Sequence, residues 1–320
     1  MLRVGMVGMG GISQSHRKAW LQMPDVKLAA VCDVRSDKVE EAAAETGAKA
    51  YTDFGAMLAS ERLDILDICL PTFLHASHAI EALNRGIHVV TEKPVSLDRA
   101  DVARIYDAAR ANDRRFMVAQ VLRFWREYMA LKEAIDTGKY GKLLSGSMSR
   151  LGTTPKWSWE NWMRDVDRSG LVPYDLHIHD LDFLVYALGK PLNTVCHRAR
   201  GENQDYFSVV YEYPGCFINA EAAWYNCDYP FQASYRFQFE RALMEYKGGQ
   251  LDIRHAGGAV ETLPDEAAIG GNGINLPTTN AYLNELRYFA DCVLSGQPCD
   301  RVRQEELEAV LDIIGIINRA

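Results

Sequence analysis

Residues 2–13 have the sequence LRVGMVGMGGIS, and this stretch decides the fold. Its first half, Leu2–Val7, is mostly apolar and predicts a buried β-strand. Several glycines follow at once, and the segment that begins at Ser13 has the composition of a helix. A strand, a glycine-rich turn and a helix in immediate succession are typical of the first βα unit of a Rossmann domain.

The glycine turn predicts a site for the pyrophosphate of a dinucleotide. Gly8 permits a tight turn, while Gly10 and Gly11 let the backbone approach the phosphates. The free N–H groups at the helix start, near Ile12, attract the same anion. Ser13 stands where a third glycine or alanine is usual, and serine is small enough for helix and strand to pack closely. A glycine-rich turn that binds no ligand is the alternative.

The residue that follows the second expected strand bears on the choice of cofactor. Asp33 follows the second expected strand, Val26–Cys32, about twenty residues after the glycines. A carboxylate there accepts hydrogen bonds from the hydroxyls of the adenosine ribose and repels a 2′-phosphate, which favours NAD over NADP. Arg35 could pair with that phosphate, so NADP is the alternative cofactor.

Short apolar runs alternate with helical segments up to residue 121. One helix is expected at Asp37–Thr46, with Ser36 as its N-cap and Gly47 as its stop, and Asp98 opens another. Several runs are apolar on successive residues, as strands covered by helices on both faces are. Residues 1–121 are therefore expected to form a doubly wound parallel sheet that binds the dinucleotide. The remaining strands are expected at Ile65–Leu70, His88–Thr91 and Phe116–Gln120.

Beyond about Gly141, apolar and polar residues alternate over longer segments. Such alternation predicts antiparallel strands with one covered face. Residues 122–320 are therefore expected to form a second, α+β domain on an open, mainly antiparallel sheet that presents the substrate. Its strands are expected at Leu143–Arg150, Asp205–Tyr213, Cys216–Trp224 and Phe231–Phe239, and its helices at Tyr174–Leu188, Ala281–Leu294 and Arg303–Asn318.

Composition disfavours several classes of partner. The 320 residues include 35 Lys and Arg against 43 Asp and Glu, with no basic run, which argues against nucleic acid and anionic membranes. No apolar stretch is long enough to span a bilayer, and the first strand leaves no room for a leader peptide. The 7 cysteines form no C-x-x-C pair. They are expected to be reduced and mostly in the core, as in a cytoplasmic protein.

Chemistry-bearing residues stand at the C-terminal ends of the later strands, where doubly wound sheets bind their ligands. Leu70 ends one expected strand and Pro71, Thr72 and His75 come after it. Glu92 and Lys93 follow the next strand, and Gln120 ends the last. These residues are expected to line the cofactor site, with Lys93 near the nicotinamide. An ordinary surface lysine at a strand end is the alternative for Lys93.

The helix expected at Tyr174–Leu188 carries a polar stripe. Asp175 and His179 are four residues apart and share one face, which Asp182 continues. On a helix otherwise rich in Leu, Val and Phe, this stripe indicates either an acid/base pair facing a cleft or simple solvent exposure. His177 and His179 point to nearly opposite faces and cannot chelate one ion, so no metal site is expected.

A tryptophan-rich loop at residues 156–164 is the expected substrate contact. Trp157 and Trp162 can stack on the C–H faces of a sugar, and Arg164 can bind its hydroxyls. Packing in the core or in a subunit interface is the alternative for the tryptophans. Because the sequence has no cluster of Lys and Arg outside the dinucleotide loop, an uncharged sugar, polyol or glycoside fits better than a phosphorylated one. Further candidates for the substrate pocket are Arg123, Tyr174, His177 and Tyr282.

The chain resembles the glucose–fructose oxidoreductase, inositol dehydrogenase and MocA-like (GFO/IDH/MocA) oxidoreductases over nearly its whole length. The resemblance rests on the Gly8–Ser13 turn, Asp33, Leu70-Pro71-Thr72 with His75, Glu92-Lys93-Pro94, and Asp175-x-x-x-His179 followed by Asp182. It implies a Rossmann domain and an open sheet that pairs subunits into homodimers or homotetramers. It also implies catalytic roles for Lys93, Asp175 and His179, and often a cis peptide bond before Pro94. His177 departs from the family, where many members carry glycine.

Together these features predict an NAD(P)-dependent oxidoreductase that oxidises a secondary alcohol of a sugar, polyol or glycoside. His179 is the expected general base, Lys93 stabilises the developing alkoxide, and Asp175 orients Lys93 or the substrate hydroxyl. One alternative is glycoside cleavage by transient oxidation and elimination. Another is a regulator that senses the dinucleotide without chemistry, although a regulator has no need of an acid/base set.

Overall fold

The computed structural model describes residues 1–264 and 279–320, which fall into two compact units. The first comprises Met1–Val121 with residues 279–304, and the second comprises residues 122–264 with Glu305–Ala320. The division expected from the sequence left the helix at Ala281–Ser295, α9, in the C-terminal domain. In the structure α9 belongs to the first unit, because it packs on α1 (Ser13–Leu21) and Arg287 pairs with Asp25 at 2.6 Å.

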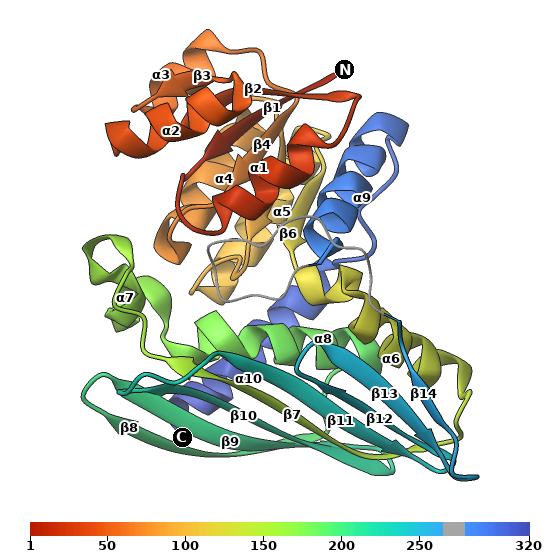
Figure 1. The fold of residues 1–320 in the computed structure, drawn as a ribbon. Coiled ribbons are helices and arrows are strands. Elements are labelled where there is room, and N and C mark those ends of the chain that lie inside the picture. The colour runs from red at the N-terminus through yellow and green to blue at the C-terminus, as the bar shows by residue number, and fades with distance from the viewer. Residues whose placement is uncertain (265–278) are drawn as a thin grey trace. The chain divides into compact units, whose positions relative to one another are not determined.

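The first unit is built on a six-stranded parallel sheet, as expected (Figure 1). Its strand order is β3-β2-β1-β4-β5-β6. The order reverses between β1 and β4, and in open α/β sheets ligands bind outside the carboxyl ends of the strands at such a switch point. The strands are β1 Leu2–Val7, β2 Val26–Cys32, β3 Lys49–Tyr51, β4 Ile65–Ile68, β5 His88–Glu92 and β6 Phe116–Ala119.

Helices cover this sheet, and their ends follow local chemistry. Asp98 accepts a hydrogen bond from the amide of Ala100 at 2.9 Å and so opens α5 (Arg99–Ala111). Gly47, at φ 69°, ends α2 (Ser36–Thr46) as expected. Ser36 is not the N-cap, because α2 starts one residue earlier than expected and Arg35 precedes it without a side-chain cap. The other helices are α3 Phe54–Ser60 and α4 His75–Asn84, with a 3₁₀ turn at Thr72–Leu74.

The second unit is built on an eight-stranded sheet of order β14-β13-β12-β11-β7-β10-β9-β8. Every neighbouring pair is antiparallel except β7 and β10, which confirms an open, mainly antiparallel sheet. The strands are β7 Leu143–Thr153, β8 Asn193–Gly201, β9 Gln204–Tyr213, β10 Cys216–Tyr225, β11 Gln232–Phe239, β12 Ala242–Lys247, β13 Gln250–His255 and β14 Val260–Thr262.

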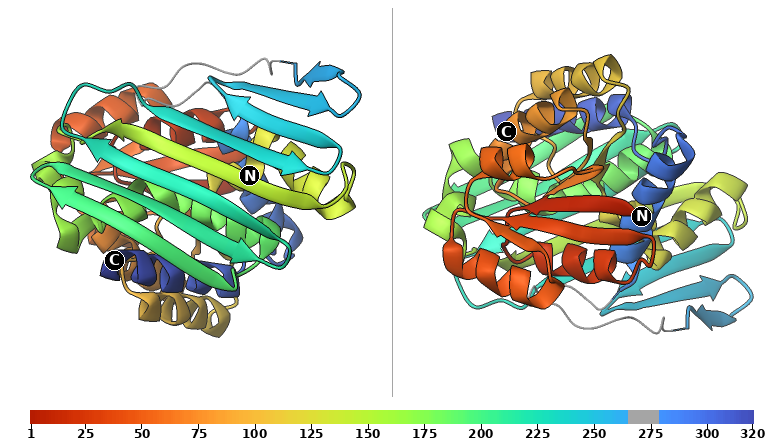
Figure 2. Two further views of the ribbon diagram at one scale, coloured as in Figure 1. Left: turned by 90° about the horizontal axis from the view of Figure 1, so that it is seen from below. Right: turned by 90° about the horizontal axis from the view of Figure 1, so that it is seen from above.

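The helices of the second unit lie on one face of its sheet, and Figure 2 shows the other face without a helix of this unit. They are α6 Arg126–Thr137, α7 Val166–Ser169, α8 Ile178–Leu188 and α10 Gln304–Arg319, with 3₁₀ turns at Val121–Phe124 and Trp159–Arg164. A single π-helical turn, Pro173–His177, leads into α8. No helix in the described part of the chain is long and apolar enough to cross a membrane.

The cysteines are all free, as expected, but most are not core residues. Only Cys32, Cys69 and Cys292 are buried, whereas Cys227 is exposed and the remaining three are half-buried. The expectation of a mainly core location was wrong because Cys196 and Cys216 lie on strands of the second sheet that alternate between covered and open positions.

Candidate functional site

The glycine turn after β1 has the shape that a pyrophosphate needs. Gly8 has φ +91°, and a Cβ there would lie 2.5 Å from the carbonyl oxygen of Cys69, so only glycine fits. At Gly10, by contrast, a Cβ would meet nothing within 4 Å, which leaves that side open to a ligand. Ser13 is fully buried and donates to the carbonyl of Gly10 at 2.6 Å. The turn leaves no room for a side chain at Gly8 but has open space beside Gly10, and it therefore fits a dinucleotide.

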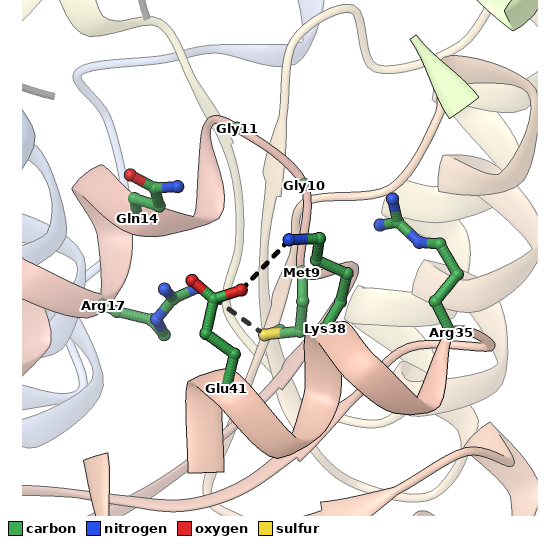
Figure 3. Close-up of a pocket in the computed structure, with 8 residues that line it drawn as sticks. All are labelled: Met9, Gly10, Gly11, Gln14, Arg17, Arg35, Lys38 and Glu41. Atoms are coloured by element: carbon green, nitrogen blue, oxygen red, sulfur yellow. Dashed lines mark hydrogen bonds and ion pairs between the residues drawn. The ribbon is translucent and has the colours of Figure 1, made fainter. Parts of the chain in front are cut away.

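A pocket opens beside this turn (Figure 3). The side chains of Lys38 and Glu41 rise from α2 toward the turn and form an ion pair of 3.0 Å. The sequence identified Gly10, Gly11 and Arg35 among the lining residues, but not Lys38. The sequence feature that could have identified Lys38 is its spacing of three residues from Arg35, which places the two residues at the same end of α2. The pocket is lined by Met9, Gly10, Gly11, Gln14, Arg17, Arg35, Lys38 and Glu41.

Asp33 contacts two of the lining residues, Met9 and Arg35, and both of its carboxylate oxygens accept hydrogen bonds. Oδ1 accepts from the backbone N–H and Nε of Arg35 at 3.0 and 2.9 Å. Oδ2 accepts from the amide of Met9 and from Nη2 of Arg35, each at 2.7 Å. Burial alone would raise the pKa of Asp33, but these hydrogen bonds lower it below its usual value. The expected ribose acceptor is therefore an anion whose charge Arg35 already balances.

His75 joins two of the predicted cofactor-site segments. Its Nδ1 lies 2.7 Å from the carbonyl oxygen of Pro94, and its Nε2 lies 2.7 Å from that of Leu70. Burial lowers the pKa of His75, while the contacts of its two ring nitrogens with these carbonyl oxygens act in the opposite direction. His75 thus holds the turn after β4 against the Lys93–Pro94 bond, which is cis as the resemblance implied.

Behind Lys93 lies a buried charge network that the sequence analysis missed. His16, on α1, lies 2.9 Å from Asp67 through Nδ1 and 3.1 Å from Glu92 through Nε2. Since both ring nitrogens face carboxylates, both must carry protons. Burial lowers the pKa of His16, but Asp67 raises it well above 6.5. The second oxygen of Glu92 accepts the amide of Lys93 at 3.0 Å, so the network fixes the backbone that carries this lysine.

The same network contains the side-chain types that a metal ion would need. Within the described residues, His16, Asp67 and Cys69 lie close enough to share an ion. The thiol of Cys69 lies 3.6 Å from the Asp67 carboxylate, which also accepts from Trp20 Nε1 at 2.7 Å. Because these atoms already satisfy one another, the cluster is a hydrogen-bonded core network.

The predicted acid/base residues of the second unit lie at the junction of the π-turn and α8. Asp175 and His179 are half-buried, whereas Asp182 of the same stripe is buried. A π-turn inside a helix frequently marks a functional site, since it re-aims the side chains that follow. The stripe is thus split between two partly accessible residues and one that belongs to the interior.

Two residues predicted for the substrate pocket have structural roles instead. Arg123 is fully buried, and its guanidinium donates to Asp182 at 2.6 Å and to Glu306. His177 is fully buried, and its Nε2 lies 2.6 Å from the hydroxyl of Tyr211. Burial, aided by the positive charge of Arg150, lowers the pKa of His177 to about 3. Neither side chain presents a donor to a substrate.

The five other candidates for the substrate pocket differ in their exposure. Tyr174 is buried on the π-turn, and Tyr282 is buried on α9 with its ring centroid 5.9 Å from that of His16. In the tryptophan-rich loop, Trp157 is 68% exposed, Trp162 is half-buried, and Arg164 donates to Asn203 at 3.1 Å. Trp157 is therefore not a core residue of its unit.

The backbone of this loop is strained. Glu160 and Asn161 have φ of 48° and 55°, in the left-handed region that residues other than glycine seldom adopt. Such conformations cluster at ligand-binding sites, where the surroundings hold them in place. The strain and the exposed tryptophan together make this loop the best substrate-contact candidate of the second unit.

Two family models match the chain. A model described as an oxidoreductase family with an NAD-binding Rossmann fold, GFO/IDH/MocA, matches residues 2–120. The GFO/IDH/MocA C-terminal domain matches residues 128–244. The two matches follow one another along the chain.

Curated relatives and solved structures agree with this match. The chain is 30% identical to myo-inositol 2-dehydrogenase of Thermotoga maritima over 61% of its own length and 57% of the relative's. It is 28% identical to D-glucoside 3-dehydrogenase of Escherichia coli, over 59% and 55%. The matches thus span little more than half of these relatives. Levoglucosan dehydrogenase, solved with NADH and levoglucosan, has a TM-score of 0.84 at 18% identity over 99% of this chain and 96% of that one, which shows a shared fold.

Proposed function

Because the chain belongs to the GFO/IDH/MocA oxidoreductase family, we propose that it transfers a hydride between a secondary alcohol of a sugar, polyol or glycoside and a nicotinamide dinucleotide. The observation that carries the proposal is the glycine turn. No Cβ fits at Gly8, whereas the space beside Gly10 is open to a ligand. Along the same edge of the sheet lies the buried charge network that fixes the backbone of Lys93. A binding site and a positioned lysine at one edge suit a dehydrogenase.

The bound dinucleotide supplies the hydride acceptor, and the chain supplies binding, orientation and proton transfer. Gly10 and Gly11 admit the pyrophosphate to the start of α1. Lys93 donates a hydrogen bond to the substrate oxygen as negative charge develops there. His179 takes the hydroxyl proton, since an imidazole titrates near neutral pH, and Asp175 orients the donor or the hydroxyl.

The proposed substrate is uncharged and rich in hydroxyls. Trp157 offers an exposed aromatic face, and Trp162 and Arg164 accompany it on a loop with strained backbone. Such a surface stacks on the C–H faces of a sugar ring while polar neighbours bind its hydroxyls. The names of the relatives, which act on inositol and on a glucoside, support the same class.

We further propose a homodimer or homotetramer that pairs through the helix-free face of the eight-stranded sheet, with neither nucleic acid nor membrane as a partner. This face includes exposed apolar side chains, such as Phe217 on β10 and Val195 on β8. A cytoplasmic location fits the free cysteines. Light scattering of the purified protein gives the subunit number.

The test is a panel of inositols, aldoses and glycosides, each incubated with protein and NAD or NADP while absorbance at the reduced-nicotinamide band is followed. One compound should yield reduced cofactor, and a substrate deuterated at the reacting carbon should pass its deuterium to the nicotinamide. Release of free sugar without net reduction would favour oxidation and elimination. Tight dinucleotide binding with neither outcome would favour a regulator and contradict the proposal.

A further inference from the structure

Two of the free cysteines lie together where α9 ends. Cys292 is on the last turn of the helix, and Cys299 follows in the segment that leads on to α10. Gly296 ends α9 with φ 71°, in the left-handed region that glycine adopts readily, and the chain turns back there. The thiol of Cys292 consequently lies 3.5 Å from the carbonyl oxygen of Pro298, and it also makes a hydrogen bond with the thiol of Cys299.

Polar contacts hold the returning segment in place. The guanidinium of Arg115, just before β6, donates to the carbonyl oxygen of Gln297 at 2.9 Å. The amide of Arg301 donates to the hydroxyl of Tyr288 at 3.0 Å, and Tyr288 lies one turn before Cys292 on α9. Each of these residues belongs to the first unit. The fold of that unit therefore keeps the two thiols side by side.

The surroundings of the pair also favour a thiolate at Cys292. The hydrogen bond with Cys299 lowers the pKa of Cys292 to about 7 although burial opposes it, and a hydrogen bond with the Tyr288 hydroxyl acts in the same direction. The carboxylates of Asp291 and Asp300 oppose ionisation, but to a smaller extent. The hydrogen bond between the thiols raises the pKa of Cys299, which remains the donor. Since the thiolate is the form that attacks an oxidant, Cys292 is the reactive member of the pair.

We propose that Cys292 and Cys299 form a redox-sensitive site, in which hydrogen peroxide converts the two thiols into a reversible disulfide. Two thiols in hydrogen-bonding contact need only a small movement to form an S–S bond. Residues 295–298 are exposed and Cys299 is half-buried, so the pair borders on solvent. The disulfide ties the end of α9 to the segment before α10. Neither cysteine is among the candidate site residues, so this inference does not depend on the proposed function.

The oxidation proceeds in two balanced steps. The Cys292 thiolate attacks one oxygen of hydrogen peroxide, so that an S–O bond forms, the O–O bond breaks, and the departing hydroxide takes a proton and leaves as water. The sulfur of Cys299 then attacks the sulfenic sulfur of Cys292. The S–S bond forms as the S–O bond breaks, and the departing hydroxide takes the Cys299 proton and leaves as a second water. The two thiols lose two electrons, which reduce the peroxide.

The test follows the thiols of the whole, fully reduced chain during exposure to hydrogen peroxide. Samples are alkylated under denaturing conditions and digested with trypsin, which releases residues 288–301 as one peptide with these two cysteines and no others. That peptide should lose two hydrogen atoms and resist alkylation at both sulfurs. Treatment with dithiothreitol should restore both thiols, since a disulfide is reversible and the higher oxides of cysteine are not.

Variants distinguish a specific site from chance oxidation. Cys299→Ala should abolish the disulfide and leave Cys292 as a sulfenic acid, which dimedone traps. Tyr288→Phe removes a hydrogen bond to Cys292 and should slow the loss of thiols at pH 7 about threefold or more. Cys227→Ser, at an exposed cysteine outside the pair, is the matched control and should change neither the product nor the rate.

The wild-type measurement decides the inference even where a variant fails to fold. Both thiols of the 288–301 peptide staying open to alkylation, at peroxide concentrations that oxidise Cys227, would overturn it. So would oxidation of Cys292 to sulfinic acid while Cys299 stays a thiol. A disulfide that disappears in Cys227→Ser would overturn it as well, because the bond would then involve a cysteine outside the pair.

Discussion

Two histidines, one in each unit, are fully buried yet carry different charge. His16 lies between the carboxylates of Asp67 and Glu92, and its pKa is raised well above 6.5 despite burial. His177 faces the hydroxyl of Tyr211, and burial with a nearby arginine lowers its pKa to about 3. The first is an imidazolium at neutral pH and the second is a neutral ring.

The difference teaches that the partner, and not burial, decides what a buried histidine does. Burial disfavours the charged form in both cases, and only an adjacent carboxylate reverses it. His16 therefore serves as a counter-charge that fixes the strand ends near Lys93. His177 serves as a neutral hydrogen-bonded core residue, which is why it is not the substrate donor that the sequence suggested.

The largest expected effect is at His16. Substitution His16→Leu leaves Asp67 and Glu92 buried without a counter-charge, and breaking such a network costs about 3–5 kcal/mol of unfolding free energy. Urea unfolding at pH 6 measures it. A loss below about 1 kcal/mol would show that His16 does not compensate the charges of Asp67 and Glu92. It would contradict the comparison between the two histidines.

A smaller loss is expected at His177. Substitution His177→Phe leaves the hydroxyl of Tyr211 buried without its partner, at a cost of about 1–3 kcal/mol. Adding Tyr211→Phe should recover part of that loss, since removing both polar partners can be nearly neutral. Urea unfolding of both single variants and the double variant gives the coupling. If the two losses simply add, the 2.6 Å contact contributes nothing specific.

The dependence of stability on pH should run in opposite directions at the two sites. The pKa of His16 is raised on folding, so its stabilisation is full below pH 6.5 and is lost as pH rises through the folded pKa. The pKa of His177 is lowered on folding to about 3. Its neutral form therefore stabilises the fold above pH 6.5, and this is lost as pH falls toward 3, by on the order of 1 kcal/mol per pH unit.

The measurement is the unfolding free energy of wild type, His16→Gln and His177→Gln between pH 4.5 and pH 9. The wild-type advantage over His16→Gln should shrink at high pH, and its advantage over His177→Gln should shrink at low pH. Parallel profiles for the two variants would contradict the assignment of charge.

The smallest effect is expected at an exposed ion pair. Glu81, on α4, and Arg85, the residue that follows this helix, lie 2.9 Å apart, and both side chains are 44% exposed. Substitution Arg85→Ala should change the unfolding free energy by less than about 0.5 kcal/mol, because solvent screens the pair. Thermal unfolding of the variant measures the change. A larger loss would show that solvent does not screen the pair and that a short distance alone predicts the strength of ion pairs in this chain.

The fold was predictable where the pattern of side chains matched a layered sheet. Leu2–Val7 and Val26–Cys32 are mostly apolar and were located to the residue. The three-residue strands β3 and β14 are too short to show a period. The membership of α9 depends on a contact between Arg287 and Asp25, 262 residues apart, which no local pattern reveals.

The positions of candidate site residues in the fold were predictable where the end of a strand decided them. Gly8 and Lys93 follow from strand ends alone, since ligands bind at that edge. Arg123 was misassigned because its partners, Asp182 and Glu306, lie 59 and 183 residues away. A polar residue in a sequence gives no sign of whether a ligand, solvent or a distant counter-charge satisfies it.

The most direct test of the central claim is the effect of His179→Ala on turnover and on dinucleotide affinity, measured with the compound that the panel identifies. Turnover should fall about 10²–10⁴-fold, as for loss of a general base, while the Kd of the dinucleotide stays within about twofold. His255→Ala, at a partly exposed histidine on β13, is the matched control and should leave both unchanged. Full turnover in His179→Ala would contradict the assigned acid/base chemistry.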